Sequence, residues 1–129
     1  RLLMDRSQIE QVLINLLKNA QEAVEIRMKE EAAGLSDEAE PAQSQASYVR
    51  LTTHLSSNKR DFIISITDNG KGILPEVMER IFVPFFTTKT NGSGIGLSIC
   101  KQIVTLHGGT ITASSKPGDK TTFSVVLPV

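Results

Sequence analysis

The sequence predicts an α+β domain in which helices pack on one face of a β-sheet. The hydrophobic periodicity changes along the chain, from one helical segment to two strands, then to two helical segments and two final strands. Because the strands come as consecutive pairs and do not alternate with helices, this order favours layered packing over a doubly wound sheet. With 129 residues the chain can form a true hydrophobic core, and we expect residues 1–129 to form a single domain.

The first helical segment is predicted from about Ser7 to Val24. Its apolar residues recur at the spacing of three and four that marks an amphipathic helix. They are Ile9, Val12, Leu13, Leu16, Leu17, Ala20 and Val24. Asp5, followed three residues later by Gln8, is a capping-box pattern, so we expect the helix to begin near Arg6.

The composition changes sharply after this helix. Residues 27–47 are rich in Ala, Glu, Ser and Gln, hold almost no bulky apolar residue, and include the breakers Gly34 and Pro41. Such a segment buries too little apolar surface to offset its ordering entropy. We interpret it as the tail of the helix followed by a mobile acidic insertion at about 28–47. A linker between domains is the alternative, but too little chain precedes it to form a domain.

Alternation of apolar and polar residues predicts four strands in two pairs. The expected strands are Val49–Leu55, Phe62–Thr67, Thr110–Ser115 and Thr121–Leu127. A short turn over residues 57–60 joins the first pair, and Pro117-Gly118 joins the second.

Two further helical segments lie between the strand pairs. Pro75 is typical of a first helical position and opens a short helix through about Ile81. The pattern of Gly94–Leu106 predicts a longer helix, which Gly108 and Gly109 terminate. Both helices are expected to cover the same face of the sheet as the first.

Charge and cysteine content exclude several classes of function. Fourteen basic residues balance fourteen acidic ones, so we expect no nucleic-acid partner, which would require a basic excess. The single cysteine, Cys100, excludes an intrachain disulfide framework and fits a reducing compartment. The longest apolar run, residues 12–17, is too short to span a bilayer, and we expect no direct membrane contact. We interpret the chain as a domain of a longer protein.

A polar stripe runs beside the apolar stripe of the first helix. It consists of Gln8, Gln11, Asn15, Asn19 and Glu22. Asn is a poor helix former, and a solvated face would more readily use Lys and Glu. Asn15 and Asn19 lie one turn apart among apolar neighbours, which suggests amide oxygens directed at a metal or ligand. The alternative is a pair of polar residues at the boundary of the core.

An acidic and glycine-rich segment, Asp68–Gly72, follows the second predicted strand. Asp68 lies where an apolar strand leaves the core, and Gly70 and Gly72 permit close approach of a backbone or ligand. A buried carboxylate at this position needs hydrogen-bond donors, and the amine of a base is one such donor. The alternative is a hairpin turn of the Asp-Gly type. The helical character of the next element argues against that turn.

A second glycine-rich segment, Gly92–Leu97, opens the long helix. Backbone N–H groups at a helix N-terminus form a natural cradle for phosphates. The segment is no Walker loop, since no Gly-Lys-Ser or Gly-Lys-Thr ends it, and Leu97 replaces the third glycine of a dinucleotide fingerprint. The motif set of protein kinases is absent as well.

Between the glycine-rich segments, three of the five phenylalanines of the chain fall within Phe82–Phe86. Clustered aromatic residues are usually core, and we expect these rings to pack there. Thr87, Thr88 and Lys89 follow at the edge of the glycine-rich segment, where they could meet a phosphate.

Together and in this order, these segments resemble the ATP-binding domain of sensor histidine kinases. That domain belongs to the superfamily of GHKL or Bergerat ATPases, which includes type II topoisomerases, mismatch-repair ATPases and heat-shock chaperones. Residues 15–20 resemble its Asn box, and residues 68–72 and 92–97 its two glycine boxes. Residues 82–86 resemble its phenylalanine box. The resemblance covers nearly the whole chain except residues 27–47, and four motifs in the right order make it specific.

The resemblance implies a two-layer α/β sandwich with helices packed on one face of a mixed sheet, and ATP and Mg²⁺ as cofactors. Asp68 would accept a hydrogen bond from the adenine amine, Asn19 with its neighbour Asn15 would ligate Mg²⁺, and Thr122 would line the adenine site. The implied nucleotide-binding residues are Asn15, Asn19, Asp68, Gly70, Gly72, Lys89, Gly92, Gly94, Gly96, Leu97 and Thr122. Asn15 and Lys89 are the candidates for a catalytic role. The stretch from Lys89 to Gly92 would be a short lid, similar to that of nitrogen-regulatory sensor kinases.

One feature departs from the family pattern. Lys120 precedes Thr121 and Thr122, where the family usually has Gly before Thr.

The resemblance favours a kinase domain that transfers the γ-phosphoryl group of Mg-ATP to a histidine on a partner helix. An ATP-hydrolysing clamp would carry a Glu as the base that activates water, where this chain has Asn15, an amide that cannot take a proton. The same residue argues against an anti-sigma-factor serine kinase. A binding module that uses the nucleotide only to regulate contacts is the remaining alternative.

No phosphoacceptor motif is present in the sequence. His54 falls in a predicted strand, and His107 falls at a helix C-terminus, where the helix dipole favours it. The resemblance therefore implies that dimerisation and phosphoacceptor helices upstream of Arg1, together with the receiver domain of a response regulator, are the partners. We expect the isolated domain to be monomeric and cytoplasmic, with a membrane-anchored parent sensor also compatible.

Overall fold

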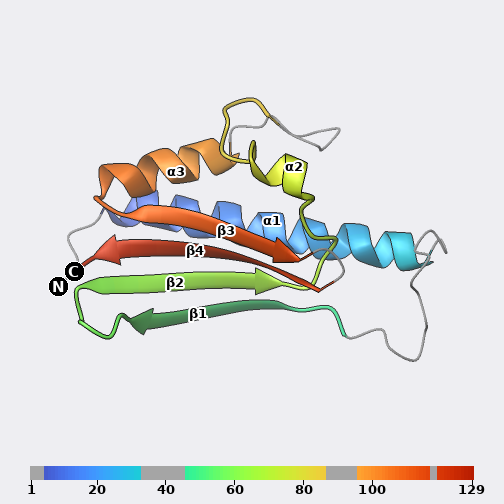
Figure 1. Cartoon of the computed structure of the whole chain (residues 1–129), viewed down its shortest axis with the longest axis horizontal. Helices are drawn as coiled ribbons and strands as arrows, with labels where there is room; N and C mark the ends of the chain where they lie inside the picture. The colour runs from blue at the N-terminus through green and yellow to red at the C-terminus, as the bar shows by residue number, and fades with distance from the viewer. Residues whose placement is uncertain (1–4, 33–45, 87–95, 117–118) are drawn as a thin grey trace.

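The structure is a computed structural model that describes residues 5–32, 46–86, 96–116 and 119–129 (Figure 1). Its elements follow in the order α1 (Arg6–Ala32), β1 (Val49–Leu55), β2 (Asp61–Asp68), α2 (Pro75–Met78), α3 (Gly96–Leu106), β3 (Thr110–Lys116) and β4 (Lys120–Pro128). This order confirms the predicted α+β class. The acidic insertion at about 28–47 lies largely outside the described residues.

The four strands form one sheet in the order β1-β2-β4-β3, and all three neighbouring pairs are antiparallel. The expectation of a mixed sheet was therefore wrong. β2 and β3 do run in the same direction, and the chain between them crosses over through α2 and α3. However, β4 returns between β2 and β3 and pairs antiparallel with both, so no two of the described strands form a parallel pair.

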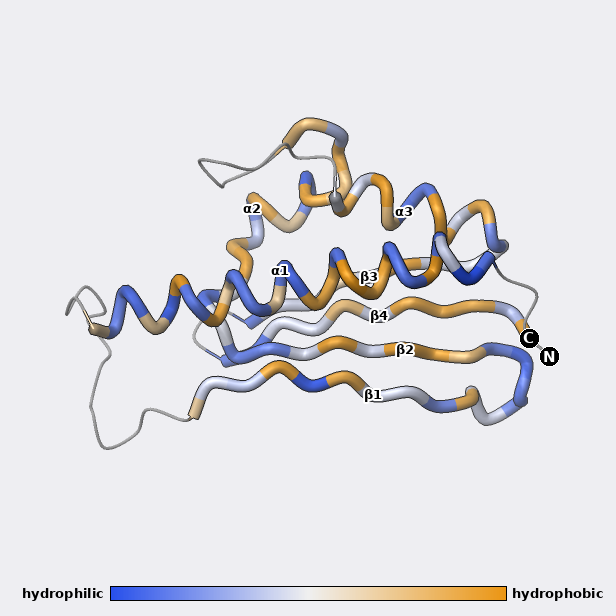
Figure 2. Tube along the Cα trace, turned by 180° about the vertical axis from the view of Figure 1, so that it is seen from behind, coloured by the Kyte–Doolittle hydropathy of each residue, from blue (hydrophilic) through white to orange (hydrophobic). Residues whose placement is uncertain are grey.

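The described helices lie on one face of the sheet, and the second face is left uncovered by them (Figure 1). Buried residues alternate with more exposed ones along β2 and β4, as expected for strands with one covered face. Figure 2 shows hydrophobic stretches along both strands. The buried core is formed by Ile9, Val12, Leu16, Ala20, Ile64, Ile66, Ile81, Cys100, Ile103, Val104, Ile111, Phe123, Val125 and Leu127. This core joins α1 and α3 to the central strands.

Helix α1 begins at Arg6, as its cap predicts, and continues past Val24 to Ala32. The Asp5 carboxylate accepts a hydrogen bond from the Gln8 N–H at 3.0 Å. The second bond of a capping box is replaced, because the Asp5 N–H donates to Nε2 of His107 at 3.0 Å. Nδ1 of His107 in turn lies 2.8 Å from the Ile103 carbonyl. The end of α3 is therefore joined to the start of α1, and the two helices run antiparallel.

The remaining boundaries agree with the sequence to within a few residues. Helix α2 is shorter than predicted and ends at Met78, although backbone hydrogen bonds from Arg80 and Val83 continue as single turns. Lys59 has a positive φ of 60° in the turn between β1 and β2. None of the helices in the described ranges combines the length and the hydropathy of a membrane-spanning segment.

Candidate functional site

Asp68 is a buried carboxylate at the end of β2, with only 3% of its surface exposed. Burial raises the pKa of this carboxyl, and the N–H of Gly70, which donates to Oδ1 at 2.8 Å, partly opposes the rise. A buried carboxylate is costly unless donors satisfy it. The position therefore suits a ligand that brings a further hydrogen-bond donor.

The loop after Asp68 packs directly on the backbone of α1. A Cβ added at Gly70 would lie 2.5 Å from the carbonyl carbon of Ala23, so only glycine fits there. The Lys71 N–H donates to the Ala23 carbonyl at 3.2 Å. Gly72 has a positive φ of 79°, the left-handed region that favours glycine. The two glycines are therefore required for different reasons: Gly70 because a side chain would collide with Ala23, and Gly72 because of its positive φ.

Asn15 and Asn19 lie on α1 between this loop and the start of the helix, and both are half-buried. Ala23, Asn19 and Asn15 are spaced four residues apart, so they share one face of the helix. With a rise of about 1.5 Å per residue, Asn19 lies about 6 Å and Asn15 about 12 Å along the helix axis from Ala23. Residues 68–72, here called the acid loop, contact α1 at Ala23, so the acid loop and the two amides follow one another along the same face of the helix.

Helix α3 approaches α1 at Asn15. The Cys100 thiol donates weakly to the Val12 carbonyl at 3.8 Å, and the Asn15 side chain hydrogen-bonds to the same sulfur. Burial raises the pKa of the Cys100 thiol to about 11, against the opposing effect of the bond from Asn15. The thiol is therefore neutral near pH 7, and it acts as a packing group rather than a nucleophile.

The N-terminus of α3 lies toward Asn19, because α3 runs antiparallel to α1 and Gly96 is one turn before Cys100. Apart from its chain neighbours and the backbone of its own helix, no described residue has an atom within 4 Å of a Cβ built at Gly96. A side chain there would enter open space, so packing within the described structure does not require this glycine. Leu97, the next residue, is half-buried against the core. Lys89, Gly92 and Gly94 lie outside the described residues.

Thr122 lies on the opposite face of the sheet from Asp68. Asp68 pairs with Thr121, and Thr121 is 3% exposed. Thr122 instead faces outward, where its hydroxyl lies 3.0 Å from that of Thr67. The register therefore contradicts Thr122 as the residue beside Asp68 and puts Thr121 there. The sequence could have indicated this, because residues two apart in a strand lie on the same face, and Thr121 is two residues before the apolar Phe123.

A second polar residue near Asp68 was missed in the sequence. Ser115 on β3 has its hydroxyl 2.7 Å from that of Thr121 and accepts a hydrogen bond from the Ile73 N–H at 2.9 Å. It thus links the sheet to the chain that leaves the acid loop. No sequence pattern singles out Ser115, because its role depends on the pairing of β3 with β4.

The phenylalanine cluster divides between core and surface. Phe82 packs edge to face on Phe123, with ring centroids 6.4 Å apart, and Lys101 Nζ lies 5.6 Å from the Phe82 ring centroid. Phe85 is 75% exposed and has a positive φ of 68°. The expectation that all three rings pack in the core was wrong for Phe85, because its left-handed backbone turns the side chain outward.

The donor chemistry of the row on α1 fits magnesium. Mg²⁺ prefers oxygen ligands and usually takes only one or two from the protein, with the rest from water and substrate phosphates. The side-chain amides of Asn15 and Asn19 offer such oxygens. In the part of the chain that the structure describes, no group of three His, Cys, Asp or Glu residues could hold a metal ion by itself.

Comparisons with known proteins agree on one family. The model of the family described as "Histidine kinase-, DNA gyrase B-, and HSP90-like ATPase" matches residues 4–129. Signal transduction histidine-protein kinase AtoS of Escherichia coli (strain K12) is 37% identical over 125 residues, which cover 97% of this chain and 17% of AtoS. Sensory histidine kinase/phosphatase NtrB of Rhizobium meliloti (strain 1021) is 36% identical over 126 residues, which cover 96% of this chain and 31% of NtrB.

Solved structures show the same similarity in three dimensions. The catalytic domain of histidine kinase ThkA superposes with a TM-score of 0.73 at 32% identity, and the match covers 99% of this chain and 71% of that domain. The chain therefore corresponds to one part of the longer curated relatives and to most of a solved catalytic domain.

Proposed function

Since the chain belongs to the family of histidine kinase-, DNA gyrase B- and HSP90-like ATPases, we propose a role for each residue of its site. The chain is of the ATP-binding catalytic type found in two-component sensor histidine kinases. What we propose is transfer of the γ-phosphoryl group of Mg-ATP to a histidine outside this chain, on the phosphoacceptor helices of the parent protein. A receiver domain would accept the phosphoryl group next.

The observation that carries this proposal is the buried carboxylate of Asp68. Its Oδ1 accepts from Gly70, and the carboxylate would also accept a hydrogen bond from the exocyclic amine of adenine. The Thr121 hydroxyl, opposite Asp68 in the register, would line the same base. Gly70 and Lys71 contact Ala23 of α1. These contacts restrict movement of the backbone next to Asp68, the residue that would bind the base.

The row of amides on α1 leads from the base toward the phosphates. Asn19 and Asn15 would hold magnesium through their amide oxygens, and the bound ion supplies positive charge that balances the triphosphate. The Asn15 side chain also interacts with the Cys100 thiol, which puts it on the side of α1 that faces α3. The N-terminus of α3, with open space at Gly96, would receive the phosphates through its backbone N–H groups. We also propose that Lys89, Gly92 and Gly94 contact the phosphates, on the basis of the sequence alone.

Phosphoryl transfer requires positioning and charge stabilisation more than covalent participation by the protein. Asn15 cannot serve as a base for water, which favours transfer over hydrolysis. Both ring nitrogens of His107 already form hydrogen bonds within the domain, and His54 lies on the outer face of the sheet. Both placements support an acceptor histidine on another domain of the parent sensor kinase.

Phosphotransfer to a separately supplied acceptor domain tests the proposal. With Mg-ATP and that domain, the wild-type chain should form phosphohistidine on the acceptor and none on itself. Asn19→Ala should reduce the transfer at least 100-fold. The matched control is Gln21→Ala, at an exposed position on α1 that contacts Glu25, and it should leave the rate unchanged. Full activity of the Asn19 variant, or phosphohistidine at His54 or His107, contradicts the proposal.

A further inference from the structure

Asn69 is a buried polar residue next to Asp68 that the proposed function does not use. Only 4% of its surface is exposed, although asparagine usually lies at protein surfaces. A buried amide has to be satisfied by hydrogen bonds, and each bond ties it to a particular segment of the chain. The partners of Asn69 therefore show what holds this end of β2 in place.

The stretch directly before β1 makes three hydrogen bonds with Asn69. Its Oδ1 accepts from the Tyr48 N–H at 2.9 Å, and its Nδ2 donates to the Ala46 carbonyl at 2.9 Å. Its backbone N–H donates to the Tyr48 carbonyl at 3.4 Å. The pairing of β1 with β2 ends at Val49 and Asp68, so Asn69 extends it by one residue, partly through its side chain.

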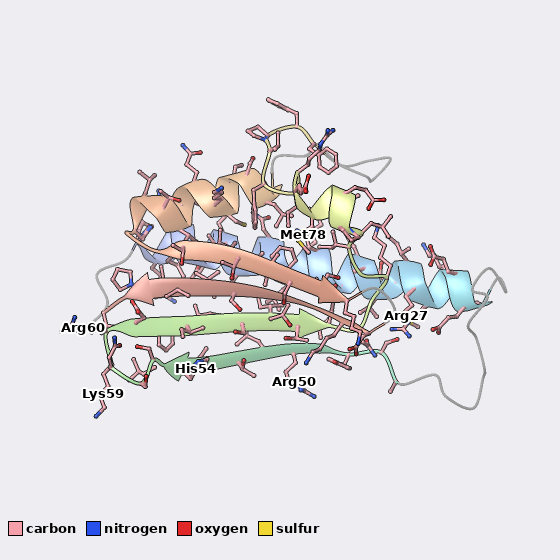
Figure 3. The ribbon with its side chains drawn as sticks, viewed as in Figure 1. Arg27, Arg50, His54, Lys59, Arg60 and Met78 are labelled. Atoms are coloured by element: carbon pink, nitrogen blue, oxygen red, sulfur yellow. The ribbon has the colours of Figure 1, made fainter. Side chains whose placement is uncertain are left out.

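The backbone carbonyl of Asn69 is bonded to α1. It accepts a hydrogen bond from the guanidinium of Arg27 at 2.5 Å. The Arg27 side chain is 27% exposed, and its Nε pairs with Glu31 at 3.1 Å. Figure 3 shows Arg27 on α1 beside the ends of β1 and β2. The guanidinium thus joins the helix to the residue directly after Asp68.

Two successive turns of α1 therefore hold the loop after Asp68. Arg27 binds the carbonyl of Asn69, and the Ala23 carbonyl, one turn earlier, accepts from the Lys71 N–H. Together with Gly70, which touches Ala23, these contacts fix the backbone on the C-terminal side of the carboxylate. The direction of a short side chain such as Asp follows its backbone. A hydrogen bond weakens steeply once its distance exceeds about 3.2 Å, so a shift of about 1 Å at this backbone is sufficient to lose one.

We propose that Asn69 and Arg27 are positioning residues that set the specificity of the site for adenine by fixing the Asp68 carboxylate. The inference rests on the proposed function, in which Asp68 binds the base. Adenine presents an amine to this carboxylate, whereas hypoxanthine presents a carbonyl oxygen at the same position. A fixed acceptor rejects the carbonyl because two acceptors would face each other, and a displaced acceptor discriminates less. The triphosphate and ribose are the same in ATP and ITP, so their contacts cancel in the comparison.

The test compares the dissociation constants of Mg-ATP and Mg-ITP by calorimetry on the whole chain. The wild type should prefer ATP by at least 30-fold. Asn69→Ala and Arg27→Met should each reduce that preference at least fivefold, through weaker binding of ATP with ITP binding unchanged within twofold. Arg27→Met keeps the apolar stem and leaves the Asn69 amide in place, so it tests the inference even if Asn69→Ala folds poorly.

Three control variants separate positioning from a general loss of structure. Arg27→Lys keeps a donor and should restore part of the preference. Glu31→Gln breaks the ion pair with Arg27 but not the bond to Asn69, and should keep the wild-type preference. Ile111→Val removes a methyl group from the core away from the loop, and should lower the melting temperature without changing the preference.

Equal losses of ATP and ITP affinity in Asn69→Ala and Arg27→Met, or an unchanged preference, overturn the inference and leave the proposed function intact. A wild-type chain that binds ATP no better than ITP contradicts the proposed role of Asp68 itself. The two failures are therefore distinguishable in one set of titrations.

Discussion

Replacing Asp68 with Asn should weaken ATP binding while leaving the fold as stable as before or more stable. The substitution keeps the shape of the side chain and an oxygen that accepts from the Gly70 N–H. It also replaces a carboxylate oxygen with an amide donor, which would face the donor of the adenine amine. A lost hydrogen bond to a charged group, with a buried donor left unpaired, costs about 3 kcal/mol in total. The expected loss of ATP affinity is therefore on the order of 100-fold.

The effect on stability has the opposite sign. Burial raises the pKa of Asp68 in the folded chain above its ordinary value in the unfolded chain. The folded state therefore binds the proton more tightly, and the stabilisation from that proton is complete below the unfolded pKa and lost as the pH rises through the folded pKa. At any pH above the folded pKa, the wild-type carboxylate is ionised and its burial lowers the stability of the fold, whereas the neutral amide of Asp68→Asn carries no such penalty. Each 1 kcal/mol gained raises the melting temperature by about 4 °C in a domain of this size.

The assay pairs calorimetric titration of Mg-ATP with thermal melting of the apo chain from pH 7 down to pH 4. We expect the stability advantage of Asp68→Asn to shrink as the pH falls, because the wild-type carboxyl then becomes neutral as well. Asp61→Asn, at the other end of β2 and half-buried, is the matched control and should leave ATP affinity unchanged. Unchanged ATP affinity, or a lower melting temperature at pH 7, would refute the reasoning.

Two more predictions follow from the glycines and the thiol. Gly70→Ala should lower the melting temperature and weaken ATP binding, because its Cβ meets the Ala23 backbone. Gly96→Ala should weaken ATP binding but keep the melting temperature, because its Cβ meets open space. Melting curves and ATP titrations of both variants check this, and a Gly70→Ala variant as stable as the wild type would contradict it. Cys100 should resist alkylation by iodoacetamide at pH 8 until the chain is unfolded in urea, because burial raises the pKa of its thiol to about 11 and keeps it neutral. Mass spectrometry measures the labelling. Rapid alkylation of the folded chain would contradict the prediction.

Much of the fold could be predicted because local patterns determine it. The apolar stripe of α1 is buried as its periodicity predicts, and Asp5 caps the helix. The sequence also located the acid loop, since an acid followed by glycines at the end of an apolar strand has few structural uses. The burial of Asp68 agrees with that interpretation. These features depend on neighbours within about ten residues, which a single sequence records.

Features that depend on pairing between distant segments could not be predicted in the same way. The return of β4 between β2 and β3 makes every pair antiparallel, and no local pattern specifies that order. Thr122 was selected although the alternation with Phe123 favours Thr121, so this error was avoidable. Phe85 was expected in the core, and its positive φ turns it out to solvent. A backbone conformation of this kind in a residue other than glycine leaves no mark on the sequence.

The long first helix explains why so much of the site depends on one element. Over little more than three turns, α1 presents the Asn15 and Asn19 amides, the Ala23 backbone that contacts the loop after Asp68, and the Arg27 guanidinium that binds Asn69. In the proposed site, a nucleotide along this face would meet groups held at fixed helical spacing, so helix geometry would set the distance between the contacts to the base and those to the phosphates.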